Sequence, residues 1–216
     1  ADLMFSDLEF NFYNSSNGNQ ISQMLFAYAG WKNIAWLRCT FHDPNDGVFD
    51  MEGLDPKPAG IFMVSCATDQ HLTAQWAVTQ IYGGPSHLAI MNSTFDEGGN
   101  HLAYLTGVDK AVISKNIFSR PAFGRTALRI TGGPVGAEGN NILVSDNQFL
   151  GWVDPLVGGS GRAGGSHNGG GKRYNYLLVQ FSPNGGGQEL LNNVTFERNV
   201  VTNYEVGMSI ANATDM

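Results

Sequence analysis

The sequence predicts an all-β protein built as a coiled repeat. Three observations carry this prediction: a recurring nine-residue phrase, a second strand-like segment between its copies, and a two-residue alternation of apolar and polar positions in both. The phrase reads polar, apolar, any, apolar, any, any, Asn or a small residue, any, apolar. It is clearest at residues 141–149, and residues 110–118 and 193–201 match it position for position.

Weaker copies of the phrase begin at Asn33, Gly60 and His87, and a degenerate copy begins near Asp7. The clear and weaker copies return after 23 to 31 residues, and once after 52. A strand that returns at such intervals indicates a solenoid. A sandwich or propeller would need antiparallel strands joined by hairpin signals such as Asn17-Gly18, which are scarce between neighbouring strands. The absence of long helical periodicity argues against alternating strands and helices.

The segment between successive copies ends in a small polar residue, often followed by Gly. Its copies are residues 48–53, 78–83, 102–107, 127–132, 178–182 and 207–211. Because side chains alternate along a strand, one side of each strand should face the interior and the other the solvent.

This two-strand rung with an Asn at its corner resembles the right-handed parallel β-helix repeat of the pectate-lyase-like superfamily. The resemblance implies one domain over residues 1–216, a right-handed single-stranded parallel β-helix of about seven rungs, with a long Gly-rich loop at 150–175. In that family the corner Asn stacks on its equivalent in the next rung. The column here would be Cys39, Cys66, Ser93, Asn116, Asn147 and Asn199.

Cys39 and Cys66 fall at the same corner, 27 residues apart. Stacked positions about 4.8 Å apart lie within the Cα range of a disulfide, so a bond between them is one hypothesis. The alternative is two small buried thiols that fill the column. Two cysteines exclude a disulfide-dense scaffold and a Cys-rich metal site.

The composition of the chain limits the kinds of molecule that it is expected to bind. Charged residues are 14% of the chain, the net charge is −7, and no run of Lys or Arg occurs, which argues against nucleic acid. No apolar stretch is long enough to span a membrane. The chain starts at Ala1 without a signal-peptide pattern, and no cap is visible at either end of the coil. We expect a segment of a longer secreted or cell-surface protein, with the periplasm as an alternative, and end-to-end self-association as a second possible contact.

In the family that the repeat resembles, the outward face of the strand ending in Thr-Gly forms the substrate groove. Aligning the strands on Thr131-Gly132 predicts an outward column of polar and aromatic residues. The column consists of Ala27, Asp50, Gln80, Tyr104, Arg129, Gln180 and Ser209. A second outward column would hold Glu52, Tyr82, Thr106, Thr131 and Ser182.

Charges are unevenly spread along this predicted groove. Acidic residues gather at Asp43, Asp46, Asp50 and Glu52, and basic residues gather at Arg120, Arg125, Arg129, Lys172 and Arg173. The 150–175 loop is either a flexible spacer or a functional lid. A basic groove on an acidic chain suits an anionic sugar. We therefore expect Asp50, Gln80, Arg125, Gln180, Lys172 and Arg173 to bind a polysaccharide.

Lyases of this fold abstract the proton next to a uronate carboxylate that a cation has neutralised. Tyr104, Arg129 and His101 supply the residue types for that reaction. Arg129 or Arg125 would pair with the carboxylate, and Tyr104 would act as base or acid. The simpler alternative is a surface cation–π pair of Tyr104 and Arg129.

A glycoside hydrolase would instead need converging carboxylates, and Asp50 and Glu52 share one strand face about 7 Å apart. Asp96 and Glu97 look like a solvated turn. No dedicated metal motif occurs, so no metal is assigned, although Asp43, Asp46 and Asp50 could hold one Ca²⁺. Three functions stay open: lyase-like action on an acidic glycan, non-catalytic carbohydrate binding, and a structural or adhesive cell-surface segment.

Overall fold

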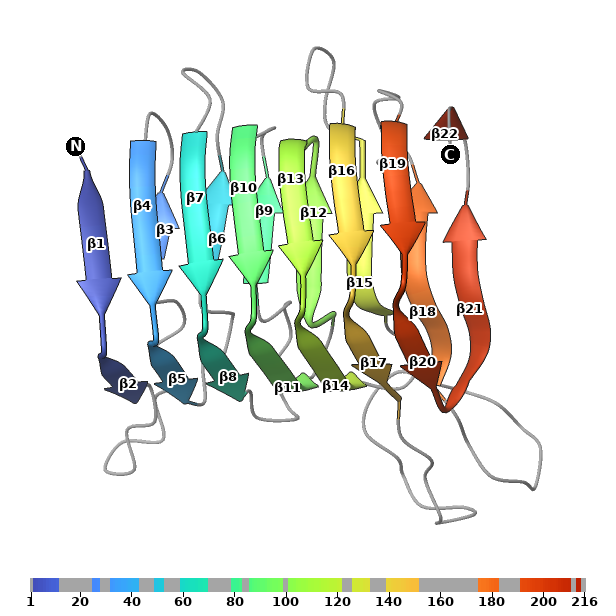
Figure 1. Ribbon diagram of the computed structural model, residues 1–216, viewed down its shortest axis with the longest axis horizontal. Coiled ribbons are helices and arrows are strands. Elements are labelled where there is room, and N and C mark those ends of the chain that lie inside the picture. Colours follow the sequence, from blue (N-terminus) through green and yellow to red (C-terminus); the bar gives the residue numbers. More distant parts are fainter. Residues whose placement is uncertain are drawn as a thin grey trace.

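The computed structural model describes residues 2–11, 25–27, 32–42, 49–52, 59–69, 79–82, 86–98, 101–121, 126–132, 139–151, 175–182, 191–210 and 213–214. Within these ranges the chain is a parallel β-solenoid with no helix, and its strands form three sheets (Figure 1). None of the described residues forms a helix that could cross a membrane.

Three strands recur in a fixed order along the chain, one for each sheet. The first sheet contains β1 (Leu3–Ser6), β4 (Lys32–Leu37), β7 (Ala59–Val64), β10 (Ser86–Met91), β13 (Asp109–Ser114), β16 (Gly139–Ser145), β19 (Leu191–Glu197) and β22 (Ala213–Thr214). The second contains β2 (Glu9–Asn11), β5 (Thr40–His42), β8 (Ala67–Asp69), β11 (Thr94–Gly98), β14 (Ile117–Pro121), β17 (Gln148–Leu150) and β20 (Val200–Thr202). The third contains β3 (Leu25–Ala27), β6 (Phe49–Glu52), β9 (Thr79–Tyr82), β12 (Ala103–Thr106), β15 (Thr126–Thr131), β18 (Asn175–Ser182) and β21 (Tyr204–Ile210).

The expected rung of two strands is therefore wrong, because the nine-residue phrase is not one strand. Residues 110–118 run along β13, turn at Lys115 and Asn116, and continue as β14. Lys115 makes the turn with a left-handed φ of 58°. The Asn that marks the phrase thus stands at a corner between two sheets.

The register of the first sheet follows the repeat. Ile34, Ile61, Leu88, Ala111, Ile142 and Val194 pair in succession along it. The degenerate first copy begins at Asp2 rather than near Asp7, since Leu3 pairs with Ile34 and the Asn33 amide donates to Asp2 at 2.7 Å. Asp7 occupies the corner position of Arg38, one turn earlier.

The interior is apolar and closely stacked. On the second sheet the rings of Phe95, Phe118 and Phe149 stack in sequence, with centroids 4.9 and 5.1 Å apart. Phe10 and Phe41 stack in the same column at 5.2 Å, and the buried Thr68 separates the two groups. Parallel strands in register force identical side chains into such stacks.

The predicted asparagine column is confirmed. Asn147 Oδ1 accepts from the backbone N–H of Asn116 at 2.9 Å and from its side-chain amide at 3.0 Å. Asn199 Oδ1 accepts in the same way from Asn147, and Asn116 Oδ1 accepts from the N–H of Ser93. The corner amides therefore satisfy backbone groups that the turn leaves outside the sheets.

Cys39 and Cys66 continue this column as free, buried thiols. The Cys66 thiol donates to the carbonyl of Trp36 at 3.4 Å, and burial raises the pKa of Cys66 to about 11. The structure thus agrees with two small buried residues that fill the column.

Candidate functional site

The outward column expected on the third sheet is present in the backbone register. Asp50 pairs with Gln80, Gln80 with Tyr104, and Tyr104 with Arg129. Arg129 then pairs with Gln180, and Gln180 with Ser209. The first member is wrong by one residue, because Phe26 rather than Ala27 pairs with Asp50.

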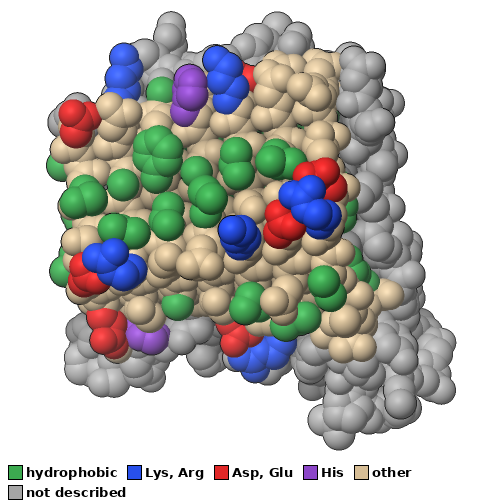
Figure 2. All heavy atoms as spheres, viewed as in Figure 1, with side chains coloured by type: hydrophobic (Ala, Val, Ile, Leu, Met, Phe, Trp, Pro, Cys, Tyr) green, Lys and Arg blue, Asp and Glu red, His purple; other side chains and the backbone are tan. Residues whose placement is uncertain are grey.

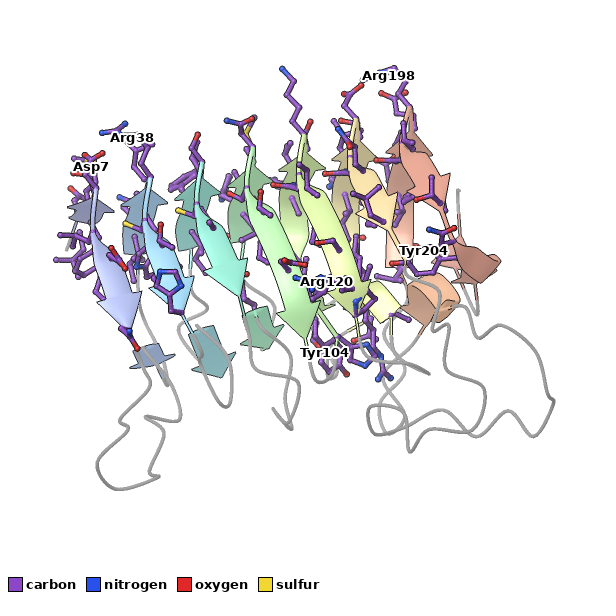
Figure 3. The ribbon with its side chains drawn as sticks, turned by 90° about the horizontal axis from the view of Figure 1, so that it is seen from below. Asp7, Arg38, Tyr104, Arg120, Arg198 and Tyr204 are labelled. Atoms are coloured by element: carbon purple, nitrogen blue, oxygen red, sulfur yellow. The ribbon has the colours of Figure 1, made fainter. Side chains whose placement is uncertain are left out.

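Tyr104 and Arg129 are in direct contact across neighbouring strands. Arg129 Cζ lies 4.7 Å from the centroid of the Tyr104 ring, within the range of a cation–π interaction. The contact follows from the register, since β12 and β15 place the two residues side by side. Figure 3 shows Tyr104 at the side of the coil opposite Asp7 and Arg38.

His101 joins this pair from the residues just before β12. Its ring centroid lies 5.7 Å from that of Tyr104, tilted by 56°, and its side chain is buried. The structure therefore brings together the three residues that the sequence singled out for catalysis.

Thr126, which the sequence did not indicate, fixes the protonation of His101. The Thr126 backbone N–H points at His101 Nδ1 over 3.1 Å, and its hydroxyl lies 2.6 Å from the same nitrogen. A backbone N–H can only donate, so Nδ1 is the accepting nitrogen and the proton of the neutral ring sits on Nε2.

With this tautomer, two donor nitrogens lie next to each other. Arg129 Nη1 lies 3.5 Å from His101 Nε2, and both atoms carry hydrogens, so they cannot bond to each other. Arg129 Nε is also buried and has no hydrogen-bond partner in the described part of the chain. Donors arranged in this way suit an acceptor with two oxygens, such as a carboxylate.

The charge grouping expected around this site needs correction. Arg120 lies on β14 of the second sheet, where its Nε donates to Asp96 Oδ1 at 2.8 Å and its Nη2 pairs with the other oxygen. Ser119 Oγ also donates to Asp96. Asp96 is therefore part of an ion pair on β11 rather than of a solvated turn, and Arg120 is engaged by that carboxylate.

Two members of the second outward column, Thr106 and Thr131, have described side chains, and both are buried. They are in register, and their hydroxyl oxygens lie 3.1 Å apart in a hydrogen bond with each other. They close the end of the third sheet and are not available to a ligand at its surface.

Other predicted site residues lie beyond what the structure describes. Arg125, Lys172, Arg173, Asp43 and Asp46 fall outside the described residues, as does most of the 150–175 loop. Asp50, Glu52, Gln80 and Gln180 are placed by their strands, and their side chains fall outside the described part. The carboxylate pair of the hydrolase alternative and the possible Ca²⁺ ligands thus stay sequence predictions. Among described residues, no group of three or more His, Cys, Asp or Glu side chains could hold a metal.

Comparison with known proteins places this chain in no family. Neither a scan of protein-family models nor a search of curated protein sequences found a match.

Proposed function

We propose that this protein binds an acidic, uronate-containing polysaccharide along its third sheet and cleaves it by a lyase-type elimination. One observation carries the proposal: the donor nitrogens Arg129 Nη1 and His101 Nε2 lie 3.5 Å apart, and both side chains contact the Tyr104 ring. A uronate carboxylate offers the two acceptor oxygens that such donors require.

The chemistry follows from neutralising that carboxylate. Arg129 pairs with one carboxylate oxygen and His101 Nε2–H donates to the other, which stabilises the negative charge that develops when the neighbouring C–H proton leaves. An elimination of this kind needs the Tyr104 oxygen as the base that accepts this proton. The released electron pair forms a C=C bond, the C–O bond to the leaving sugar breaks, and the leaving oxygen takes the proton from the Tyr104 hydroxyl, which restores the base.

We further infer that the coil is right-handed and belongs with the pectate-lyase-like β-helices. Crossover connections between parallel strands of one sheet are right-handed in nearly all proteins. The asparagine column along the corner agrees with that superfamily. Extracellular or cell-surface localisation is part of the same proposal, since the polymer substrate lies outside the cell.

Non-catalytic glycan binding is the second candidate, and the cation–π contact favours it. Arg129 stacked on Tyr104 forms a flat, charged surface that could hold an anionic sugar without any proton transfer. A structural or adhesive role of the solenoid is compatible with the same surface.

Ultraviolet absorbance of the unsaturated product, measured on a panel of uronate polymers, tests the lyase function. Tyr104→Phe should abolish turnover and retain binding, because it removes only the hydroxyl. Arg129→Ala should reduce kcat/KM by about 100-fold or more, the usual loss when one transition-state donor is removed. Gln148→Ala, an exposed change on the second sheet, should have no effect.

The outcomes separate the candidates. Unchanged turnover in Tyr104→Phe would refute the assigned chemistry. Binding that depends on Arg129 without any unsaturated product on any polymer would replace the lyase by a carbohydrate-binding protein. Polymer binding that is insensitive to Arg129→Ala would remove the third sheet from the function.

A further inference from the structure

The outward side of the first sheet is apolar along most of its length. One register column runs through Met4, Ala35, Phe62, Ala89, Val112, Leu143 and Thr195. Met4 is 69% exposed and Phe62 is 36% exposed. Leu37, Val64 and Met91 pair in a second, partly exposed column two residues further along the strands. Figure 2 shows hydrophobic side chains gathered on this face of the molecule.

We call this patch, over β1, β4, β7, β10, β13 and β16, the apolar face. A contiguous apolar patch of this extent on a folded protein marks an interaction surface. The whole outward side of these six strands measures about 20 Å along the strands and about 29 Å across them, or roughly 580 Å². A standard protein–protein interface buries about 800 Å² on each partner.

A row of corner residues borders the apolar face where the first-sheet strands end. In order along the coil it contains Asp7, Arg38, Ser65, Asn92, Lys115, Asp146 and Arg198, all with φ between 51° and 58°. Arg38 pairs with Asp7 through bonds of 2.5 and 2.7 Å, and Arg198 pairs with Asp146 through bonds of 2.8 and 3.0 Å. These pairs are exposed, so their outer sides can meet another molecule.

If this row faces a second copy of itself in the opposite order, the charges of the two ion pairs meet charges of opposite sign. When a second copy is reversed along the coil, Asp7 comes opposite Arg198, and Arg38 opposite Asp146. A two-fold axis parallel to the strands at β10 produces this arrangement. The other two-fold axis in the plane of the sheet, along the coil, would set Lys115 against Lys110 at the opposite border, so that like charges meet.

We propose that the apolar face binds the same face of a second copy, in a two-fold symmetric dimer whose axis runs along β10. Ala89 and Met91 then meet their own counterparts at the axis, while Phe62 lies opposite Val112. The two sheets pack face to face about 10 Å apart, and the corner rows close one border with alternating charges. Such an interface is isologous, so one surface serves both partners and no open filament forms.

Charge swaps that keep the Asp7–Arg38 and Asp146–Arg198 ion pairs in reversed order test this dimer. Variant N carries Asp7→Arg and Arg38→Asp, and variant C carries Asp146→Arg and Arg198→Asp. Asp and Arg both occupy left-handed corner positions in the native chain, so the backbone tolerates either. Within one copy the pairs 7–38 and 146–198 survive, although variant C loses the contact of Arg198 with Glu197. Between two identical copies Arg meets Arg and Asp meets Asp.

Sedimentation velocity over a concentration series gives the readout. The native protein should be dimeric, and variants N and C alone should each dimerise at least about tenfold more weakly, because facing like charges are costly. An equimolar mixture of N and C should form a heterodimer with native-like affinity, since all facing charges are then opposite. A purely structural effect of the swaps would not be repaired by mixing.

The apolar contacts are tested separately. Phe62→Lys should abolish dimerisation, whereas Val200→Lys, an equally conspicuous apolar residue at 56% exposure on the second sheet, should not. A native protein that stays monomeric at all concentrations overturns the proposal. A dimer that survives Phe62→Lys, or an N and C mixture that stays monomeric, overturns it as well.

Discussion

Asn147 shows how much of the coil depends on single corner side chains. It is fully buried, its amide donates to the carbonyl of Ile113 at 2.9 Å, and its oxygen accepts two bonds from Asn116. Alanine at this position would remove the acceptor of the Asn116 N–H and of its side-chain amide, and it would remove one donor to the Ile113 carbonyl. The asparagine therefore stabilises two neighbouring turns at once.

We predict that Asn147→Ala lowers the free energy of unfolding by about 2–5 kcal/mol, since each buried unsatisfied group costs about 1–3 kcal/mol. Gln148→Ala, an exposed change at the next residue, should cost less than about 0.5 kcal/mol. Urea unfolding followed by circular dichroism measures both. Equal unfolding midpoints for the two variants would contradict the role assigned to the column.

For single residues, the sequence predicted contacts between equivalent positions of successive turns better than contacts that form where the chain changes direction. The asparagine column and the contact of Tyr104 with Arg129 follow from register alone, and both are present. Thr126 and the Arg120–Asp96 pair were missed. Their partners are fixed by how a loop or a left-handed turn returns to the next strand, which alternation does not encode.

At the scale of elements, the sequence predicted parallel strands and their register, but it did not predict where one strand ends and the next begins. The phrase was interpreted as one strand, although its buried apolar positions change parity between Ile113 and Phe118, where the chain turns onto the second sheet. The expected alignment of β3, the first strand of the third sheet, was wrong by one residue, with Ala27 in place of Phe26. The reason is that β3 lacks the Thr-Gly ending that aligned the later strands. Alternation with a period of two residues shows which side of a strand faces the interior. A further signal is needed to show where the chain turns from one sheet to the next.

The ring stack of the second sheet gives a prediction at this scale. Phe118 lies between Phe95 and Phe149 and is fully buried, whereas Phe10 contacts one stacked ring and is only partly buried. Phe118→Ala should cost about 3–5 kcal/mol, the usual range for a buried Phe. Phe10→Ala should cost clearly less, because a partly exposed ring at the end of the stack leaves a smaller cavity.

Chemical unfolding of both variants compares these costs, with Phe118→Leu as the matched control that keeps most of the volume. A Phe10→Ala variant that loses as much stability as Phe118→Ala would show that the stack acts as one unit. In that case the coil would unfold without the nearest-neighbour behaviour expected of a solenoid.

At the scale of the whole molecule, the two proposed surfaces lie on different sides of the coil. The corner row with Asp7, Arg38 and Arg198 borders the first sheet, and Tyr104 lies on the opposite side (Figure 3). The apolar face was open to prediction, since positions of the phrase that were taken as unrestricted hold Ala35, Phe62, Ala89, Val112 and Leu143. The sequence interpretation assigned roles only to polar outward columns, and it assigned none to an apolar outward column.

This separation predicts that dimerisation and glycan binding are independent for short ligands and coupled for long ones. In the dimer two third sheets are held by one rigid body, so a long polymer that reaches both is retained by effective concentration. Variant N, with Asp7→Arg and Arg38→Asp, should bind a short oligouronate with native affinity per chain. Its retention on the polymer should fall by about tenfold or more.

Calorimetry with the oligouronate and affinity electrophoresis with the polymer separate the two effects. Adding variant C to variant N should restore polymer retention, because the heterodimer again holds two third sheets. This prediction rests on both proposals, and the results distinguish their failures. Weaker binding of the short ligand by variant N would show that the first-sheet border takes part in the glycan site. Native polymer retention by a monomeric variant N would mean that one third sheet alone holds the polymer.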